Sequence, residues 1–259
     1  MLKESSEMSS QVLEGCEDFA LGEGRTGALL VHGFTGSPQG LRALGGYLAE
    51  RGIAVVAPRL PGHGTTWQDL ATRNAEEWWS CSETAFHDLA ARCDEVFLVG
   101  LSFGATLSLD LAAHYPDRVS GFVGLASFVT SRDPRRFLAP VIRRLVPSLP
   151  GVGNDIADPE AREIVYDRVP TAGAYRMLQY CKRVIRSLDA VRCPVLLIHS
   201  RHDHTAHPIN AQLISDRVSS EDKETVWLER SYHVITLDHD RDEVFERTFD
   251  FIETRSRAL

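Results

Sequence analysis

The sequence lacks the features that mark several large classes of protein. Its 28 Lys and Arg against 36 Asp and Glu give a net charge of −8, and no long basic run offsets it, so a nucleic-acid partner is not expected. No apolar stretch approaches the roughly 20 residues of a membrane-spanning helix, and the first twenty residues hold no signal-peptide core. These absences predict a cytoplasmic protein.

The five cysteines form no recognisable framework. Their number is odd, they are scattered along the chain, and no Cys-x-x-Cys spacing occurs among them. Reduced thiols fit this pattern better than disulfides or a zinc site. The sequence also contains no internal repeat or low-complexity segment, so its 259 residues predict one large domain with room for an insertion.

Short apolar runs alternate with helical patterns along most of the chain. The alternation predicts an α/β protein with a mostly parallel sheet and helices on both faces. The strand-like runs lie at 25–32, 53–58, 95–101, 119–126, 194–200 and 224–229, and the helical patterns lie at 38–51, 76–93, 105–114, 208–218 and 241–254.

Residues 128–190 interrupt this alternation because they contain no strand-like run. A loop of that length is abnormal in a compact domain, so we expect a helical cap (lid) inserted over the strand ends. The core is then divided into residues 21–127 and 191–259. The Ser- and Glu-rich start predicts a loose tail over residues 1–20.

The most informative motif is Gly100-Leu-Ser-Phe-Gly104, which follows an apolar run and precedes a helical pattern. Strand, sharp turn and helix in this order indicate a nucleophile elbow. The backbone turns so tightly at Ser102 that residues without a Cβ atom are needed on both sides. Ser102 is therefore the candidate nucleophile, and an ordinary tight turn is the alternative.

A serine hydroxyl needs a base to take its proton, and the base needs a residue to orient it. After a serine elbow the acid and the histidine are expected later in the chain, in that order. Asp203 follows the run at 194–200 and His233 follows the run at 224–229, so both lie at the same sheet edge as Ser102. The alternatives are Asp189 and Asp238 for the acid, and His202, His204, His207 and His239 for the base.

The histidines around Asp203 also allow a metal site to be considered. Their segment is a strand followed by a turn, which points side chains in several directions, and no His-Glu-x-x-His helix is present. We therefore expect no metal. The group consists of His199, His202, Asp203, His204 and His207.

The oxyanion of an acyl-transfer reaction needs two preorganised N–H donors. One is expected from the backbone of Phe103, directly after the nucleophile. The other is expected from Phe34 in His32-Gly-Phe-Thr-Gly36, after the first predicted strand. An ordinary glycine turn is the alternative for this second motif.

From about Arg25 onward the chain resembles bacterial monoacylglycerol lipases and related carboxylesterases of the α/β-hydrolase superfamily. The resemblance implies the α/β-hydrolase fold, a triad of Ser102, Asp203 and His233, oxyanion donors at Phe34 and Phe103, and no cofactor. It rests on His32-Gly-Phe-Thr-Gly36, Pro61-Gly-His-Gly64, Gly100-Leu-Ser-Phe-Gly104, Gly153-Asn-Asp155, His202-Asp-His204 and Ser231-Tyr-His-Val-Ile-Thr-Leu-Asp238.

The same resemblance implies a serine esterase that cleaves monoacylglycerols, with Glu163 of the cap binding the glycerol hydroxyls. An exposed helical glutamate is the alternative for Glu163. The nearest alternative function is a general carboxylesterase for short- to medium-chain esters. More distant alternatives are a C–C or thioester hydrolase and a ligand receptor built on this fold.

Two features of the cap bear on the substrate. Its first part has one apolar face, which we expect either to line an acyl tunnel or to pack on the core. Five arginines nearby, against Asp133 alone, predict transient contact with an anionic lipid surface, with a solvated face as the alternative. The apolar face comprises Phe137, Val141, Ile142, Leu145 and Leu149, and the arginines are Arg132, Arg135, Arg136, Arg143 and Arg144.

Overall fold

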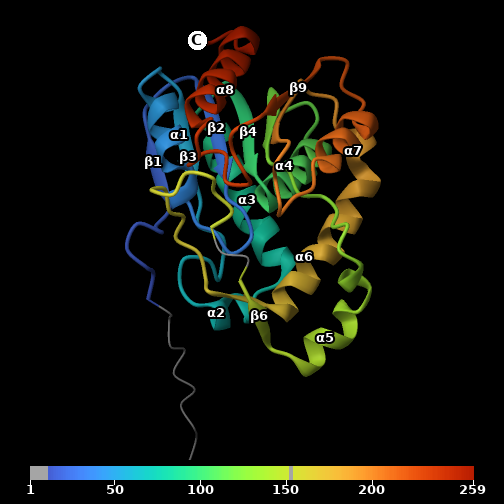
Figure 1. The fold of residues 1–259 in the computed structure, drawn as a ribbon. Coiled ribbons are helices and arrows are strands. Elements are labelled where there is room, and N and C mark those ends of the chain that lie inside the picture. The colour runs from blue at the N-terminus through green and yellow to red at the C-terminus, as the bar shows by residue number, and fades with distance from the viewer. Residues whose placement is uncertain (1–10, 152–153) are drawn as a thin grey trace, which may run out of the picture.

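The computed structural model describes residues 11–151 and 154–259, which are drawn as a ribbon in Figure 1. The predicted tail at residues 1–10 and Gly153 of the cap motif lie outside the described residues, as do the side chains of Arg135 and Arg136. No helix in the described part combines the length and the apolar character needed to cross a bilayer.

The elements follow one another in the alternating order that the sequence predicts. In chain order they are β1 (Phe19–Leu21), β2 (Thr26–Val31), α1 (Gln39–Ala49), β3 (Ala54–Ala57), α2 (Trp67–Thr72), α3 (Ala75–Ala90), β4 (Glu95–Leu101), α4 (Phe103–His114), β5 (Gly121–Leu125), η1 (Pro134–Phe137), α5 (Ala139–Leu145), β6 (Ser148–Pro150), β7 (Arg168–Pro170), α6 (Thr171–Val184), η2 (Ile185–Ala190), β8 (Val195–Ser200), α7 (Ile209–Arg217), β9 (Lys223–Leu228) and α8 (Arg241–Arg255).

Within the described residues, seven strands form one sheet in the order β1-β3-β2-β4-β5-β8-β9. Only β1 runs antiparallel to its neighbour, while the other neighbouring pairs are parallel. Apolar side chains of α1 and α8 pack on one face, and those of α3, α4 and α7 pack on the other. The structure therefore confirms the predicted α/β fold with a mostly parallel sheet.

The topology brings four loops to one edge of the sheet. Because β2, β4, β8 and β9 run parallel, their carboxyl ends meet at that edge, where ligands of such sheets bind. The loops that follow these strands contain the glycine-rich motif, Ser102, Asp203 and His233. Of the segment from 128 to 190, α5 and β6 lie at the lower end of the molecule in Figure 1, while α6 runs up its right-hand side and η2 packs against α4.

Two sequence expectations need correction. The predicted tail over residues 1–20 is too long, because Phe19 is buried and pairs with Ala57 in the sheet. The cap is also not purely helical, since β6 and β7 form a second, two-stranded sheet within it. These strands have three residues each, which is too short to leave an apolar pattern in the sequence.

The turn between β4 and α4 explains why its two glycines are needed. A Cβ atom at Gly104 would overlap the backbone carbonyl of Val31, and one at Gly100 would overlap the backbone of Ala105. Ser102 between them has φ 54° and ψ −117°, a conformation that L residues rarely adopt. Close packing of α4 against β2 therefore holds the turn in place.

We expect Gly104→Ala to lower the free energy of unfolding by about 3 kcal/mol, because a new methyl group must displace the backbone of β2. The matched control is Gly46→Ala, whose new methyl group has no neighbour within 4 Å. It should be neutral or stabilising by about 0.5–1 kcal/mol, since glycine is disfavoured inside a helix. Urea unfolding followed by circular dichroism measures both, and equal stability of the two variants would contradict this packing.

Candidate active site

Three side chains from separate loops form one continuous chain of hydrogen bonds. Ser102 Oγ lies 2.9 Å from Nε2 of His233, and Nδ1 of the same imidazole lies 2.8 Å from Oδ2 of Asp203. The carboxylate can only accept, so Nδ1 donates to it and Nε2 is left to accept from the serine hydroxyl. This arrangement suits removal of the Ser102 proton by His233.

The Asp203 carboxylate is fully buried and held by its own loop. Its Oδ1 accepts from the backbone N–H of Thr205 at 2.9 Å and of Ala206 at 2.6 Å. Burial alone would raise the pKa of this carboxyl, but the charge and hydrogen bonds of His233 and His199 outweigh burial and hold the pKa well below its usual range. Asp203 is therefore ionised at neutral pH.

The environment of His233 strengthens it as a base. Burial alone would lower the pKa of its imidazole. The charge and hydrogen bond of Asp203 raise the pKa, as do the charges of Asp155 and Glu163, and the net result lies above the ordinary 6.5. The charges of three nearby carboxylates thus favour the protonated form of this imidazole.

The other candidate acids lie elsewhere. Asp238 accepts hydrogen bonds from four backbone N–H groups, two in its own loop (Tyr232 and His239) and two in the cap (Ala157 and Asp158). Asp189 is exposed in η2. Neither carboxylate contacts His233 in the described structure.

The other candidate histidines either form hydrogen bonds elsewhere or are exposed. Nδ1 of His204 lies 2.9 Å from Oδ1 of Asp155, and His207 accepts from the backbone N–H of Ile209. His202 and His239 are exposed. Among the described residues no group of three or more metal-ligating side chains gathers at one point.

The glycine-rich loop after β2 lies directly against Ser102, the candidate nucleophile. A Cβ atom on Gly33 would be 3.2 Å from Cβ of Ser102, so this loop approaches closely only because Gly33 has none. The backbone N–H groups of Phe34 and Phe103, the expected oxyanion donors, donate to no acceptor within residues 11–151 and 154–259. Both amides therefore remain free for a ligand.

His32 fixes the shape of that loop. Its Nε2 accepts from the backbone N–H of Leu60 at 3.1 Å, so Nδ1 carries the proton and donates to the Gly33 carbonyl at 2.9 Å. Complete burial lowers the pKa of His32 to about 4, and the ring stays neutral. The loops after β2 and β3 are thereby tied together beside Ser102.

A cavity of about 200 Å³ opens onto Ser102 and His233. Its walls are mostly apolar, which suits an acyl chain. It is lined by Gly33, Phe34, Thr35, Leu101, Ser102, Phe128, Gly151, Asp155, Glu163, Val165, Tyr166, Val169, Ala174, Met177, Thr205, His233 and Val234.

Glu163 projects from the cap into this cavity. Its carboxylate lies against Gly36 and Gly40, where added Cβ atoms would come within 2.6 and 3.4 Å of Oε1. Burial raises the pKa of the carboxyl to about 7, although the charge of His233 acts in the opposite direction. No hydrogen bond from the described residues reaches this carboxylate, while its backbone N–H is held by Asn154.

The structure places the predicted acyl-tunnel residues elsewhere. The side chains of Phe137, Val141 and Leu145 are exposed by 72%, 57% and 75%, and Ile142 is only half-buried. None of them lines the cavity beside Ser102. α5 contacts α6, where the Arg143 guanidinium stacks over Tyr175 at 4.2 Å, and the apolar face of α5 is left exposed.

Asp155 stands in the Gly153-Asn-Asp155 motif, to which the sequence analysis assigned no role of its own. Its carboxylate accepts from Nδ1 of His204 at 2.9 Å and from Oγ1 of Thr205 at 2.8 Å, beside Asp203. Its backbone carbonyl accepts from the N–H groups of His233 and Val234 at 2.9 and 3.2 Å. One cap residue thus binds both catalytic loops, a pairing over about 50 to 80 positions that no local pattern reveals.

Comparison with known proteins agrees with this geometry. The chain is 38% identical over 248 residues to the thermostable monoacylglycerol lipase of Bacillus sp. (strain H-257), covering 94% of this chain and 98% of that protein. It is 29% identical over 238 residues to a carboxylesterase of Bacillus subtilis (strain 168), covering 91% and 95%.

The fold is shared with a solved structure from work on LipS and LipT, two metagenome-derived lipolytic enzymes. The TM-score is 0.91 at 36% identity, over 94% of this chain and 100% of that chain. A family described as serine aminopeptidase, S33 (Hydrolase_4) matches residues 23–240. This chain therefore belongs to the serine aminopeptidase S33 family of serine hydrolases, within the α/β-hydrolase superfamily.

Proposed function

We propose that this chain hydrolyses the ester bond of monoacylglycerols through a serine acyl-enzyme. The observation that carries the proposal is the unbroken chain from Ser102 through His233 to Asp203, which opens into the same apolar cavity as the unpaired Glu163 carboxylate. The 38% identity to a protein named monoacylglycerol lipase supports the substrate class.

In this mechanism Ser102 Oγ attacks the acyl carbon while its proton passes to Nε2 of His233. The amides of Phe34 and Phe103 hold the oxyanion. Return of the proton to the leaving glycerol oxygen breaks the C–O bond and leaves the acyl group on Ser102. Water then gives a proton to His233 and attacks the acyl carbon, and Ser102 recovers its proton as the fatty acid leaves. His233 carries every proton, so the cycle requires no cofactor.

Glu163 is our candidate for recognition of the glycerol moiety. Above its pKa of about 7 the ionised carboxylate accepts hydrogen bonds from two neighbouring hydroxyl groups, and a methyl ester offers no such groups. No described residue donates to this half-buried carboxylate, and a bound diol would supply donors. This interaction would distinguish a monoacylglycerol from a simple ester of equal chain length.

A general carboxylesterase for short- to medium-chain esters is the second candidate. The cavity of about 200 Å³ is smaller than the roughly 300–1,000 Å³ of typical ligand pockets, which favours short acyl groups. The 29% identical relative is named a carboxylesterase. The two candidate functions share the triad and differ only in whether the enzyme recognises the glycerol leaving group.

Hydrolysis rates on monoacylglycerols beside methyl esters of equal chain length test the proposal. We expect Ser102→Ala to abolish activity on both series. Glu163→Gln should lower kcat/KM for monoacylglycerols about tenfold relative to methyl esters of equal chain length, the loss of one good hydrogen bond. Glu160→Gln, which changes an exposed glutamate of the same segment, is the matched control. Equal wild-type rates on the two series would establish the carboxylesterase instead.

The pH dependence of kcat/KM on a methyl ester tests His233 as the base. The base must be neutral, and its pKa is raised, so activity should fall as pH decreases through a midpoint above 6.5. Glu163→Gln removes one of the charges that raise this pKa and should move the midpoint to lower pH. A rate that stays constant from about pH 5 to 8 would exclude His233 from this role.

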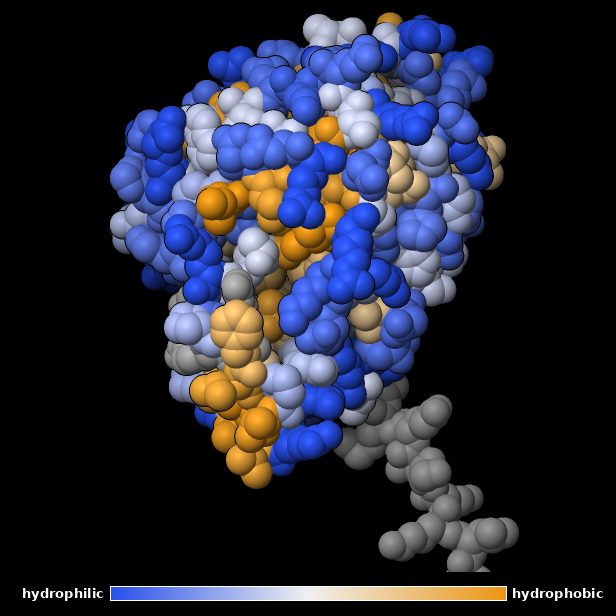
Figure 2. Space-filling model, turned by 90° about the vertical axis from the view of Figure 1, so that its right-hand side faces the viewer, coloured by the Kyte–Doolittle hydropathy of each residue, from blue (hydrophilic) through white to orange (hydrophobic). Residues whose placement is uncertain are grey.

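We also propose that the cap touches anionic lipid surfaces, where monoacylglycerols collect. Apolar side chains on and beside α5 are exposed at one end of the molecule, and they form the orange region at the lower end of the face in Figure 2. Arg144 is exposed beside them. Such a surface binds headgroups by charge and acyl chains by burial. The cytoplasmic location stays a prediction.

Flotation with phosphatidylcholine vesicles, with and without phosphatidylglycerol, tests this contact. The bound fraction should rise with the anionic lipid, and Leu145→Asp should lower it several-fold by placing a charge in the apolar surface. The control is Leu259→Asp, an exposed apolar side chain near the C-terminus, which lies at the opposite end in Figure 1. A bound fraction that does not depend on the anionic lipid would contradict the proposal. An equal loss of vesicle binding in both variants would also contradict it.

A further inference from the structure

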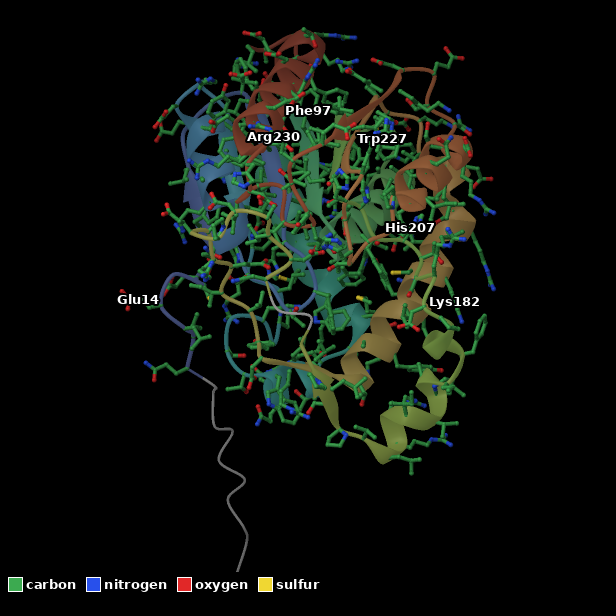
Figure 3. All side chains as sticks on the ribbon, in the orientation of Figure 1. Glu14, Phe97, Lys182, His207, Trp227 and Arg230 are labelled. Atoms are coloured by element: carbon green, nitrogen blue, oxygen red, sulfur yellow. The ribbon has the colours of Figure 1, made fainter. Side chains whose placement is uncertain are left out.

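A second histidine lies beside the catalytic carboxylate. His199 is on β8, its side chain is 1% exposed, and its ring packs 6.2 Å from that of Trp227 on β9, which is labelled in Figure 3. The mechanism described above does not use it. A buried histidine that contacts the triad invites the question of what its ring does there.

The contacts of His199 determine which nitrogen carries the proton. Nε2 lies 2.7 Å from the backbone carbonyl of Ala206, which can only accept, so Nε2 bears the hydrogen. The same nitrogen lies 3.3 Å from Oδ2 of Asp203. Nδ1 is buried and has no partner within the described residues. The ring is therefore a donor at Nε2, which is hydrogen-bonded to the Ala206 carbonyl and lies in polar contact with the Asp203 carboxylate.

This donor completes the surroundings of the carboxylate. Oδ1 of Asp203 accepts two backbone N–H groups, from Thr205 and Ala206. Oδ2 accepts from His233 at 2.8 Å, and His199 is the second donor that faces it. Without His199 the oxygen that orients the base would have a single donor and more freedom to rotate.

We propose that His199 is a positioning residue, which holds Oδ2 of Asp203 in line with Nδ1 of His233. The inference rests on the proposed serine-hydrolase mechanism and adds a fourth side chain to it. The unpaired Nδ1 supports the assignment, because a buried polar atom without a partner destabilises the fold. A residue that served only to pack against Trp227 would be better as an apolar side chain.

The test compares two substitutions at this position. His199→Gln keeps an N–H donor at about the place of Nε2, and its amide has hydrogens for both Ala206 and Asp203. His199→Leu keeps volume and removes the donor. The control is His202→Gln, an exposed histidine of the following turn. If the leucine variant fails to fold, His199→Asn, whose amide is too short to reach Asp203, replaces it.

We expect His199→Leu to lower kcat between about tenfold and a hundredfold with little change in KM, since a misplaced base slows the chemical step. His199→Gln should stay within about threefold of the wild type. The acid limb of the pH profile should move to higher pH in His199→Leu only, because Oδ2 of Asp203 then interacts with His233 alone. The other charged groups that face His233, Asp155 and Glu163, are unchanged in both variants.

A proton NMR spectrum reports directly on the hydrogen bond between His233 and Asp203. The downfield signal of the proton between His233 and Asp203 should shift in His199→Leu and stay in place in His199→Gln. Equal kcat, pH profile and proton signal in the two variants would overturn the inference, as would a glutamine variant as impaired as the leucine variant.

Labelling of Ser102 by a fluorophosphonate separates this inference from the proposed function. Wild-type protein that does not react would refute the serine-hydrolase mechanism itself. Normal labelling of the wild type, with equal labelling rates for His199→Leu and His199→Gln, would refute only the role of His199.

Discussion

The buried contact between the Asp203 carboxylate and the His233 imidazole is the interaction on which this site depends. A carboxylate removed from water is unfavourable unless donors surround it, and here backbone N–H groups and two imidazoles supply them. The same requirement fixes the loop after β8 in one conformation. Asp238 plays the corresponding part in the loop after β9, where its four backbone N–H donors come equally from that loop and from the cap.

The sheet explains why such distant residues meet. Parallel strands deliver their carboxyl ends to one edge, and burial on both faces leaves little freedom in register. The turn at Ser102 has an unfavourable backbone conformation, which persists because Gly100 and Gly104 let α4 pack against β2 and β4. Rigid packing of α4 against the sheet thus maintains the strained backbone at Ser102.

The sequence predicted those parts of the molecule that leave a local pattern. The alternation of apolar runs and helical patterns gave the fold class, and position after a strand was enough to choose Asp203 over Asp238. Short elements such as β1 and α2 carry too few residues to show a period. The apolar stripe of α5 was visible, but a stripe does not say whether it faces a cavity or solvent. The sequence placed Asp155 in a family motif and His199 in a histidine group considered for a metal, but neither pattern indicated a contact with the triad.

The bonds made by Asp155 have a consequence for the stability of the site. The carbonyl and carboxylate of this one residue accept from both catalytic loops, so displacement of the cap segment around it removes hydrogen bonds from the loops of His233 and Asp203 at once. Local unfolding of such segments is cooperative, because each is stable only while the others are in place. In hydrogen-exchange terms, the loops after β8 and β9 and the cap around residue 155 form a single opening unit. The cap segment at Asp155 does not open independently of these two loops.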